Sequence, residues 1–195
     1  MAAPARRMNL FYWAPTDELW GHCSLALSDG THISWWPMTE PGEGKKHPGL
    51  VPIALFTEWI NAYQNQTLAK DTEYEGRQPA VLAIPVGLNE GAIKVWWQKF
   101  KQSQKYQAAR LNCSTVVFLA LKQGGALNVV QDPGNWWWDP DRTLQFARAM
   151  KHAMEVKKKG QVQFQQTSQA FTRQLQLARQ AADQKAMAAH YAPMY

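Results

Sequence analysis

Cysteine is scarce in this chain of 195 residues, which contains two, Cys23 and Cys113. Two cysteines exclude the multi-bridge framework of a small secreted domain, so one bridge or two free thiols remain. Long apolar runs are also missing. Nowhere do eighteen apolar residues follow one another, and the N-terminus has two arginines but no apolar run of signal-peptide length. The sequence therefore predicts a soluble protein without an ordinary secretion signal.

Acidic residues are fewer than basic ones, 15 against 21, which gives a formal net charge of +6. A net positive charge by itself indicates only non-specific attraction to nucleic acid. Because the sequence has no nucleic-acid recognition motif, no nucleic-acid partner is expected. The segment with His22, Cys23 and His32 lacks metal-ligand spacing. We therefore expect no metal and no other cofactor.

A β-hairpin is predicted for residues 22–36, where apolar and polar residues alternate on both sides of Ser28-Asp29-Gly30. Gly30 suits a left-handed backbone angle, so a three-residue loop that pairs Leu27 with Thr31 is plausible. A two-residue Asp-Gly loop is the alternative, but it would place apolar and polar residues together on each face of the hairpin. With the longer loop the core face carries Cys23, Leu25, Leu27, Ile33 and Trp35, and the site face carries His22, Ser24, Ala26, His32, Ser34 and Trp36.

A buried helix is predicted to begin at Cys113, because Val116, Val117, Ala120 and Leu121 recur at helical spacing before Gly124-Gly125. The N–H groups and the dipole of a first helical turn favour negative charge, so a thiolate there is stabilised. A neighbouring imidazole such as His22 would carry the proton. Since Cys23 is predicted to face away from His22, a Cys23–Cys113 bridge is disfavoured.

The alternative for each residue is structural: a cysteine in an apolar helix is more often inert, and a histidine on a strand is more often part of the core. Family resemblance favours catalysis. The stretch from His22 to Pro37 and the Asn112-Cys113 dipeptide resemble the circularly permuted NlpC-type papain-like superfamily, and within it the lecithin:retinol acyltransferase-like proteins.

That resemblance implies an α+β fold in which a central antiparallel sheet packs on the helix that carries the nucleophile, followed by C-terminal helices. It implies His22 as the base and Cys113 as the nucleophile. Ser34 falls where the family usually has a second histidine, and a hydroxyl can orient His22 but cannot supply charge. His32, on the same face, is the alternative third residue.

Tryptophans gather near the predicted site in two groups, Trp35-Trp36 and Trp136-Trp137-Trp138. Three adjacent aromatics cannot all face one core, so we expect these five residues, with Asn112, to contact substrate or a lipid interface. Packing between two elements is the alternative. The tryptophans at 96 and 97, in a helix capped by Asn89, fit the core better.

The chain divides by composition into a catalytic domain, residues 1–145, and a basic Gln/Ala-rich helical extension, residues 146–195. Segments 54–64 and 143–156 have helical spacing, residues 8–13 and 80–86 resemble strands, and residues 157–160 (Lys-Lys-Lys-Gly) are predicted to interrupt the C-terminal helix. A basic amphipathic helix can bind anionic lipid or an acidic partner, or can simply be solvated.

These features favour a cysteine-dependent phospholipase A or lipid acyltransferase that acts on a membrane surface. The wider superfamily cleaves peptide bonds in bacterial cell walls, so a peptidoglycan amidase or endopeptidase is the alternative. A non-catalytic interaction module is a third. The known roles of the superfamily and the absence of a signal peptide together predict an antibacterial toxin that is made in the bacterial cytoplasm. We expect type VI secretion to deliver it to the envelope of the target cell and an immunity protein to restrain it.

Overall fold

The computed structural model describes residues 7–39, 54–134 and 137–190. Its contacts divide the chain into two compact units, residues 1–154 and 155–195. The first unit combines a four-stranded antiparallel sheet with helices, so the predicted α+β class with a central antiparallel sheet is confirmed.

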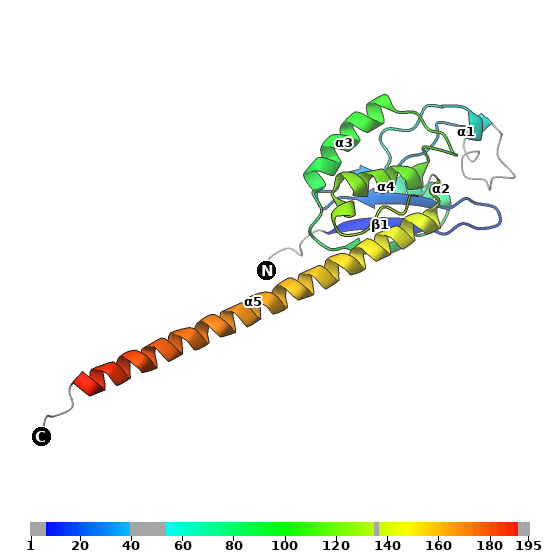
Figure 1. Cartoon of the computed structure of the whole chain (residues 1–195). Coiled ribbons are helices and arrows are strands. Elements are labelled where there is room, and N and C mark those ends of the chain that lie inside the picture. The colour runs from blue at the N-terminus through cyan, green and yellow to red at the C-terminus, as the bar shows by residue number, and fades with distance from the viewer. Residues whose placement is uncertain (1–6, 40–53, 135–136, 191–195) are drawn as a thin grey trace, which may run out of the picture. The chain divides into compact units, whose positions relative to one another are not determined.

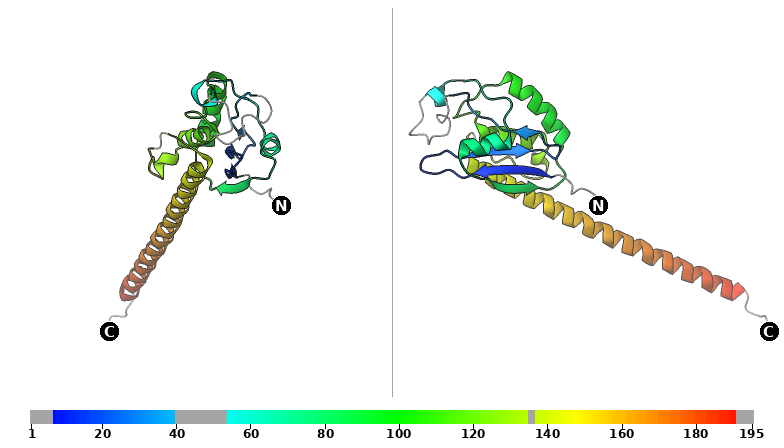
Figure 2. Two further views of the ribbon diagram at one scale, coloured as in Figure 1. Left: turned by 90° about the vertical axis from the view of Figure 1, so that its right-hand side faces the viewer. Right: turned by 180° about the vertical axis from the view of Figure 1, so that it is seen from behind.

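The sheet has the strand order β3-β2-β1-β4. Its strands are β1 (Met8–Trp13), β2 (His22–Ala26), β3 (His32–Ile33) and β4 (Ala80–Ile84). Helix α2 (Leu68–Glu75) covers one face of the sheet and helix α4 (Cys113–Gln123) covers the other (Figures 1 and 2). The beginning of β2 therefore lies between two helices.

The predicted hairpin register is confirmed. Leu25 pairs with Ile33, and the Leu27 N–H donates to the Thr31 carbonyl at 2.9 Å. Gly30 closes the three-residue loop with φ +91°. The five predicted core-face side chains are all at most 3% exposed.

Gly21 fixes the entry of the chain into β2. Its φ is +73°, and a Cβ built there would lie 2.3 Å from the Trp13 carbonyl oxygen. No other residue fits this close approach of two backbones without a shift. As a result the next residue, His22, stands directly opposite Trp13.

Two asparagines start the helices that build the core beside the sheet. The Asn89 side chain accepts from the Ala92 N–H ahead of α3 (Glu90–Ser103), and Asn112 accepts from the Thr115 N–H ahead of α4. Gly124 ends α4 as predicted, and a short 3₁₀ helix, η3 (Ala126–Asn128), follows. Trp97 is buried, which confirms the core assignment for that residue.

Two predicted features are wrong. Within 54–64 the helix α1 covers only Ala54–Thr57, because Ile60 and Ala62 instead form β-bridges with Tyr106 and Pro37. Residues 157–160 do not interrupt the C-terminal helix, since α5 runs from Pro140 to His190. Lysine favours helix, and a single glycine costs only about 1 kcal/mol.

Helix α5 begins with a typical start signal. Asp139 precedes it and accepts from the Arg142 N–H at 2.7 Å, while Pro140 occupies the first turn, where its missing N–H is not needed. In the second unit α5 exposes Phe164 (73%) and Phe171 (61%). No helix in the described part of the chain is both long and apolar enough to cross a membrane.

Candidate functional site

His22 and Cys113 line the same cavity, which has a volume of about 230 Å³. The two residues come from opposite layers, since His22 begins β2 and Cys113 begins α4, which packs against β2. The rest of the wall is largely apolar, with Pro15, Trp20, Trp35, Trp36, Tyr106, Trp137, Trp138 and Pro140, and the polar residues Asn112, Ser114, Asp139 and Asp141 also line it. His22 and Cys113 therefore lie in a cavity that is rich in aromatic side chains and has two carboxylates in its wall.

The Cys113 thiol occupies the first turn of α4. Its Sγ lies 3.8 Å from the Ser114 hydroxyl. Burial alone would raise the pKa of Cys113, but the net shift is downward, because the His22 ring, the Cys23 backbone N–H and the Ser114 hydroxyl all stabilise the thiolate. Cys113 thus has the environment of a nucleophilic thiol.

A hydrogen-bond relay fixes the protonation of His22. The Ser34 hydroxyl donates to Asp71 Oδ1 at 2.8 Å, and His22 Nε2 lies 3.0 Å from Ser34 Oγ. Because a hydroxyl has one proton and Asp71 receives it, Ser34 must accept from His22. His22 therefore carries its proton on Nε2, and Nδ1 remains for the Cys113 thiol.

Two indole rings enclose His22. Trp36 stacks on it with ring centroids 4.2 Å apart, and Trp13 lies tilted at 5.5 Å. Burial alone would lower the pKa of His22, but the Cys113 thiolate and the Asp71 carboxylate outweigh it and raise the pKa to about 10. The aromatic faces further favour the imidazolium. These shifts favour the thiolate–imidazolium form of the Cys113–His22 pair.

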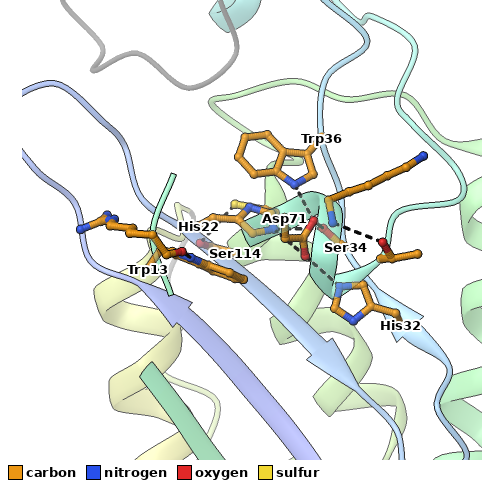
Figure 3. A network of polar contacts seen from close by, with 11 residues as sticks. Trp13, His22, His32, Ser34, Trp36, Asp71 and Ser114 are labelled. Atoms are coloured by element: carbon orange, nitrogen blue, oxygen red, sulfur yellow. Dashed lines mark hydrogen bonds and ion pairs between the residues drawn. The ribbon is translucent and has the colours of Figure 1, made fainter. Parts of the chain in front are cut away.

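Asp71 is the residue that the sequence did not reveal. It lies fully buried on α2 and accepts from Ser34, from Trp36 Nε1 at 2.9 Å and from His32 Nε2 at 2.8 Å, and its Oδ2 is 3.6 Å from His22 Nε2 (Figure 3). Burial alone would raise the pKa of Asp71, yet the two histidines hold it well below its usual range. Asp71 supplies the charge that Ser34 lacks.

The two candidates for the third position both contact Asp71. Ser34 also contacts His22 directly, whereas His32 binds the other carboxylate oxygen, Oδ2. Ser34 therefore joins His22 to Asp71, and His32 helps to hold Asp71 in place. A catalytic role for either residue stays a prediction.

The predicted substrate contacts differ in their surroundings. Trp35 and Trp138 reach the cavity but pack mainly in the core, Trp35 against Trp97 and Trp138 stacked on Phe118 at 4.0 Å. Trp36 and Trp137 also line the cavity, and Trp136 lies outside the described residues.

Asn112 also lines this cavity, but both ends of its side-chain amide already have hydrogen-bond partners. Nδ2 donates to the Ala108 and Trp138 carbonyls at 3.0 and 2.8 Å, and Oδ1 caps α4. The side chain therefore fixes the start of α4 and the segment at Trp138. A substrate contact by Asn112 stays a prediction.

Tyr106 was not expected at the site. It lines the cavity, and both burial and the Cys113 thiolate raise the pKa of its hydroxyl. Its signal in the sequence was weak, because it lies in a short bridge with Ile60 rather than in a periodic element.

Comparison with known proteins adds one result. The family model of the IcsB middle domain matches residues 61–186, more than half of the chain. The chain belongs to the IcsB middle domain family. No curated protein and no solved structure matches it.

The residues that match the IcsB middle domain include only part of the site. They include Asp71, Cys113 and Tyr106, and they extend along α5. The hairpin with His22 and Ser34 precedes them. Asp71 and Cys113 therefore lie in the matched region, and His22 comes from the preceding hairpin.

The ion pair in this IcsB-type domain predicts the pH dependence of alkylation. With its pKa lowered, Cys113 should react with iodoacetamide at neutral pH, and the rate should rise with pH well below the range of an ordinary thiol near 8.5. Cys23 should not react, because it is buried and its pKa is raised. Peptide mass spectrometry after timed alkylation measures both sites.

The His22→Ala variant is the control for this profile. Without the imidazolium, burial should dominate and move the Cys113 titration to higher pH. The thiolate–imidazolium form also has an alkaline limit, since deprotonation of His22 near its pKa of about 10 should end it. Equal profiles for the wild type and His22→Ala would contradict the ion pair.

Proposed function

We propose that this protein is a cysteine-dependent acyl hydrolase or acyltransferase that acts on membrane phospholipids. The proposal rests on the geometry of one cavity, which Cys113 at the start of α4 and His22 both line, while Ser34 and Asp71 hold the His22 ring. A soft nucleophile, a base and a helix N-terminus are the parts that thiol acyl transfer needs.

The proposed reaction has two steps. The Cys113 thiolate attacks the acyl carbonyl, the oxyanion forms near the first-turn N–H groups of α4, and the leaving alcohol takes the proton from the His22 imidazolium as the carbonyl–oxygen bond breaks. A thioester on Cys113 results. Neutral His22 then removes a proton from water or from another molecule that accepts the acyl group. The deprotonated oxygen attacks the thioester, and the Cys113 thiolate leaves.

The proposed fold is the permuted papain-like fold of the NlpC type, within the branch that resembles lecithin:retinol acyltransferase. In support, the base on a strand precedes the nucleophile in the chain, and a later helix begins with the nucleophile. The helix packs on that strand. The same order of elements led to the resemblance in the sequence.

A lipid ester is favoured over a wall peptide by the chemistry of the cavity. Its wall is largely apolar and rich in aromatic side chains, although Asp139 and Asp141 also line it, so it suits an acyl chain better than the polar backbone of a peptide. The exposed Phe164 and Phe171 and the basic residues 157–159 of α5 further suit an anionic membrane surface.

An antibacterial role is the second part of the proposal, with type VI delivery to the target envelope and a cognate immunity protein. Membership of the IcsB middle domain family, a bacterial effector domain, supports the effector class. When wild-type protein is directed to the periplasm of a bacterium without the partner, we expect growth arrest, and Cys113→Ala should be harmless. Normal growth with the wild type would contradict this role.

Mass spectrometry of the products tests the substrate class. Phospholipid vesicles and purified peptidoglycan are each incubated with the wild type and with Cys113→Ala. We expect fatty acid and lysophospholipid from vesicles with the wild type alone. Cys113-dependent muropeptides would instead assign the protein to the cell-wall hydrolases, and the absence of products from both substrates would contradict hydrolysis and favour a non-catalytic module.

A further inference from the structure

A second cavity, of about 610 Å³, lies beside α2 and the C-terminal end of α3. Six amide side chains dominate its wall: Asn61, Asn65, Gln64, Gln66, Gln102 and Gln104. Tyr63 and Tyr74 add aromatic rings, with centroids 6.5 Å apart. None of its described lining residues carries a carboxylate, so the cavity suits a polar ligand.

The charge on its wall is positive, from Lys70 and Lys105. Lys105 follows the C-terminus of α3, where the helix dipole alone favours a cation. Lys70 lies in the first turn of α2, where the dipole disfavours one. Helix stability therefore does not favour the exposed Lys70, whereas an anion in the cavity would.

Gln66 supplies an independent sign of a ligand. Its side chain lines the cavity and is only 8% exposed, and its Oε1 is buried without a hydrogen-bond partner among the described residues. A buried amide oxygen normally has a donor. A ligand hydroxyl would provide it once the Gln66 side chain turns into the cavity, so the ligand should combine hydroxyl groups with negative charge.

Helix α2 separates this cavity from the catalytic relay. Gln66, Lys70 and Tyr74 recur every four residues and line the cavity, while Asp71 on the neighbouring face holds Ser34. Tyr74 also meets Trp36 edge-on at 5.6 Å, and Trp36 stacks on His22. A ligand here would therefore contact the helix that orients the base.

We propose that this cavity binds a phosphorylated polyol, with Lys70 and Lys105 on the phosphate and Gln66 accepting from a hydroxyl. The same chemistry occurs in a soluble sugar or inositol phosphate and in the headgroup of phosphatidylinositol. The inference does not depend on the proposed catalytic function, because it rests on a separate cavity.

Titration of the ¹⁵N-labelled full-length protein tests the proposal, with myo-inositol 1-phosphate, myo-inositol and inorganic phosphate as probes. We expect saturable binding of the inositol phosphate, with shifts at Gln66 and Tyr74, and weaker binding of the other two. Lys70→Gln should weaken binding about ten- to a hundredfold, as expected for a lost charged hydrogen bond. Lys99→Gln, on an exposed part of α3 outside the cavity, should bind like the wild type.

A second variant and a vesicle experiment complete the test. Gln66→Leu should keep the amide spectrum of the folded protein but lose the preference for inositol phosphate over inorganic phosphate. Binding to phosphatidylinositol vesicles that soluble inositol phosphate displaces would support the headgroup as the source, and binding of the soluble probe alone would support a free metabolite. Absence of saturable binding, or equal affinity for the wild type and Lys70→Gln, would overturn the proposal.

Discussion

Replacement of Cys113 by alanine should lower acyl hydrolysis by about 10⁴- to 10⁶-fold, as removal of a covalent nucleophile does in other hydrolases. The fold should remain intact, because Cys113 is only partly buried at the start of α4 and alanine favours helix. Initial rates on phospholipid vesicles, together with thermal unfolding, measure the two effects separately.

Cys23→Ala is the matched control for this variant. Cys23 is fully buried in the core and its thiol contacts the Pro140 carbonyl, so its loss should destabilise the fold by about 1 kcal/mol. Its backbone N–H, which faces the Cys113 thiolate, is retained, so the activity per folded molecule should persist. Cys-independent hydrolysis in Cys113→Ala would contradict the assignment of the nucleophile.

Replacement of Asp71 by asparagine should lower activity on the order of 10³-fold or more, by analogy with loss of the carboxylate in hydrolase triads. An amide NH₂ at this position can donate to Ser34, and Ser34 would then donate to His22 Nε2. That reversal moves the His22 proton to Nδ1, where the base is needed, and it also removes the buried negative charge. Rates at fixed pH and the alkylation profile of Cys113 measure the loss.

Ser34→Ala is the comparison that separates charge from hydrogen bonding. It removes the relay, but Asp71 remains 3.6 Å from His22 Nε2, so the carboxylate still stabilises the imidazolium. The expected loss is about ten- to a hundredfold, the value of one hydrogen bond to a charged group. A larger loss in Ser34→Ala than in Asp71→Asn would contradict the role given to Asp71.

Local sequence patterns predicted the parts of the site that depend on local structure. The Ser28-Asp29-Gly30 turn set the hairpin register, which placed His22, Ser34 and Trp36 on one face. Apolar spacing and glycines likewise located α4, with Cys113 in its first turn. Each of these signals spans a few residues, within reach of a periodicity argument.

Asp71 could not be found in this way. It lies in the eight-residue helix α2, where an acidic residue in the first turn is ordinary compensation of the dipole. Its burial follows from packing against a hairpin 37 residues earlier in the chain, at Ser34. Only the three-dimensional fold brings these elements together.

The predicted helix over 54–64 was wrong for a related reason. Its apolar spacing was real, but Trp59 is 47% exposed, and Ile60 and Ala62 pair with distant segments. Backbone pairing between segments far apart in the sequence leaves no signal in the local apolar spacing. The spacing of residues 54–64 therefore favoured a helix where the chain forms β-bridges.

Covalent trapping of the acyl-enzyme tests whether Cys113 is the nucleophile. The wild type and His22→Ala are incubated briefly with phospholipid vesicles, quenched in acid, and measured by intact-protein and peptide mass spectrometry. We expect an added acyl mass on the peptide with Cys113 in the wild type, removable by hydroxylamine and strongly reduced in His22→Ala. Product formation without any acyl adduct, or an adduct on a different residue, would contradict the thioester at Cys113.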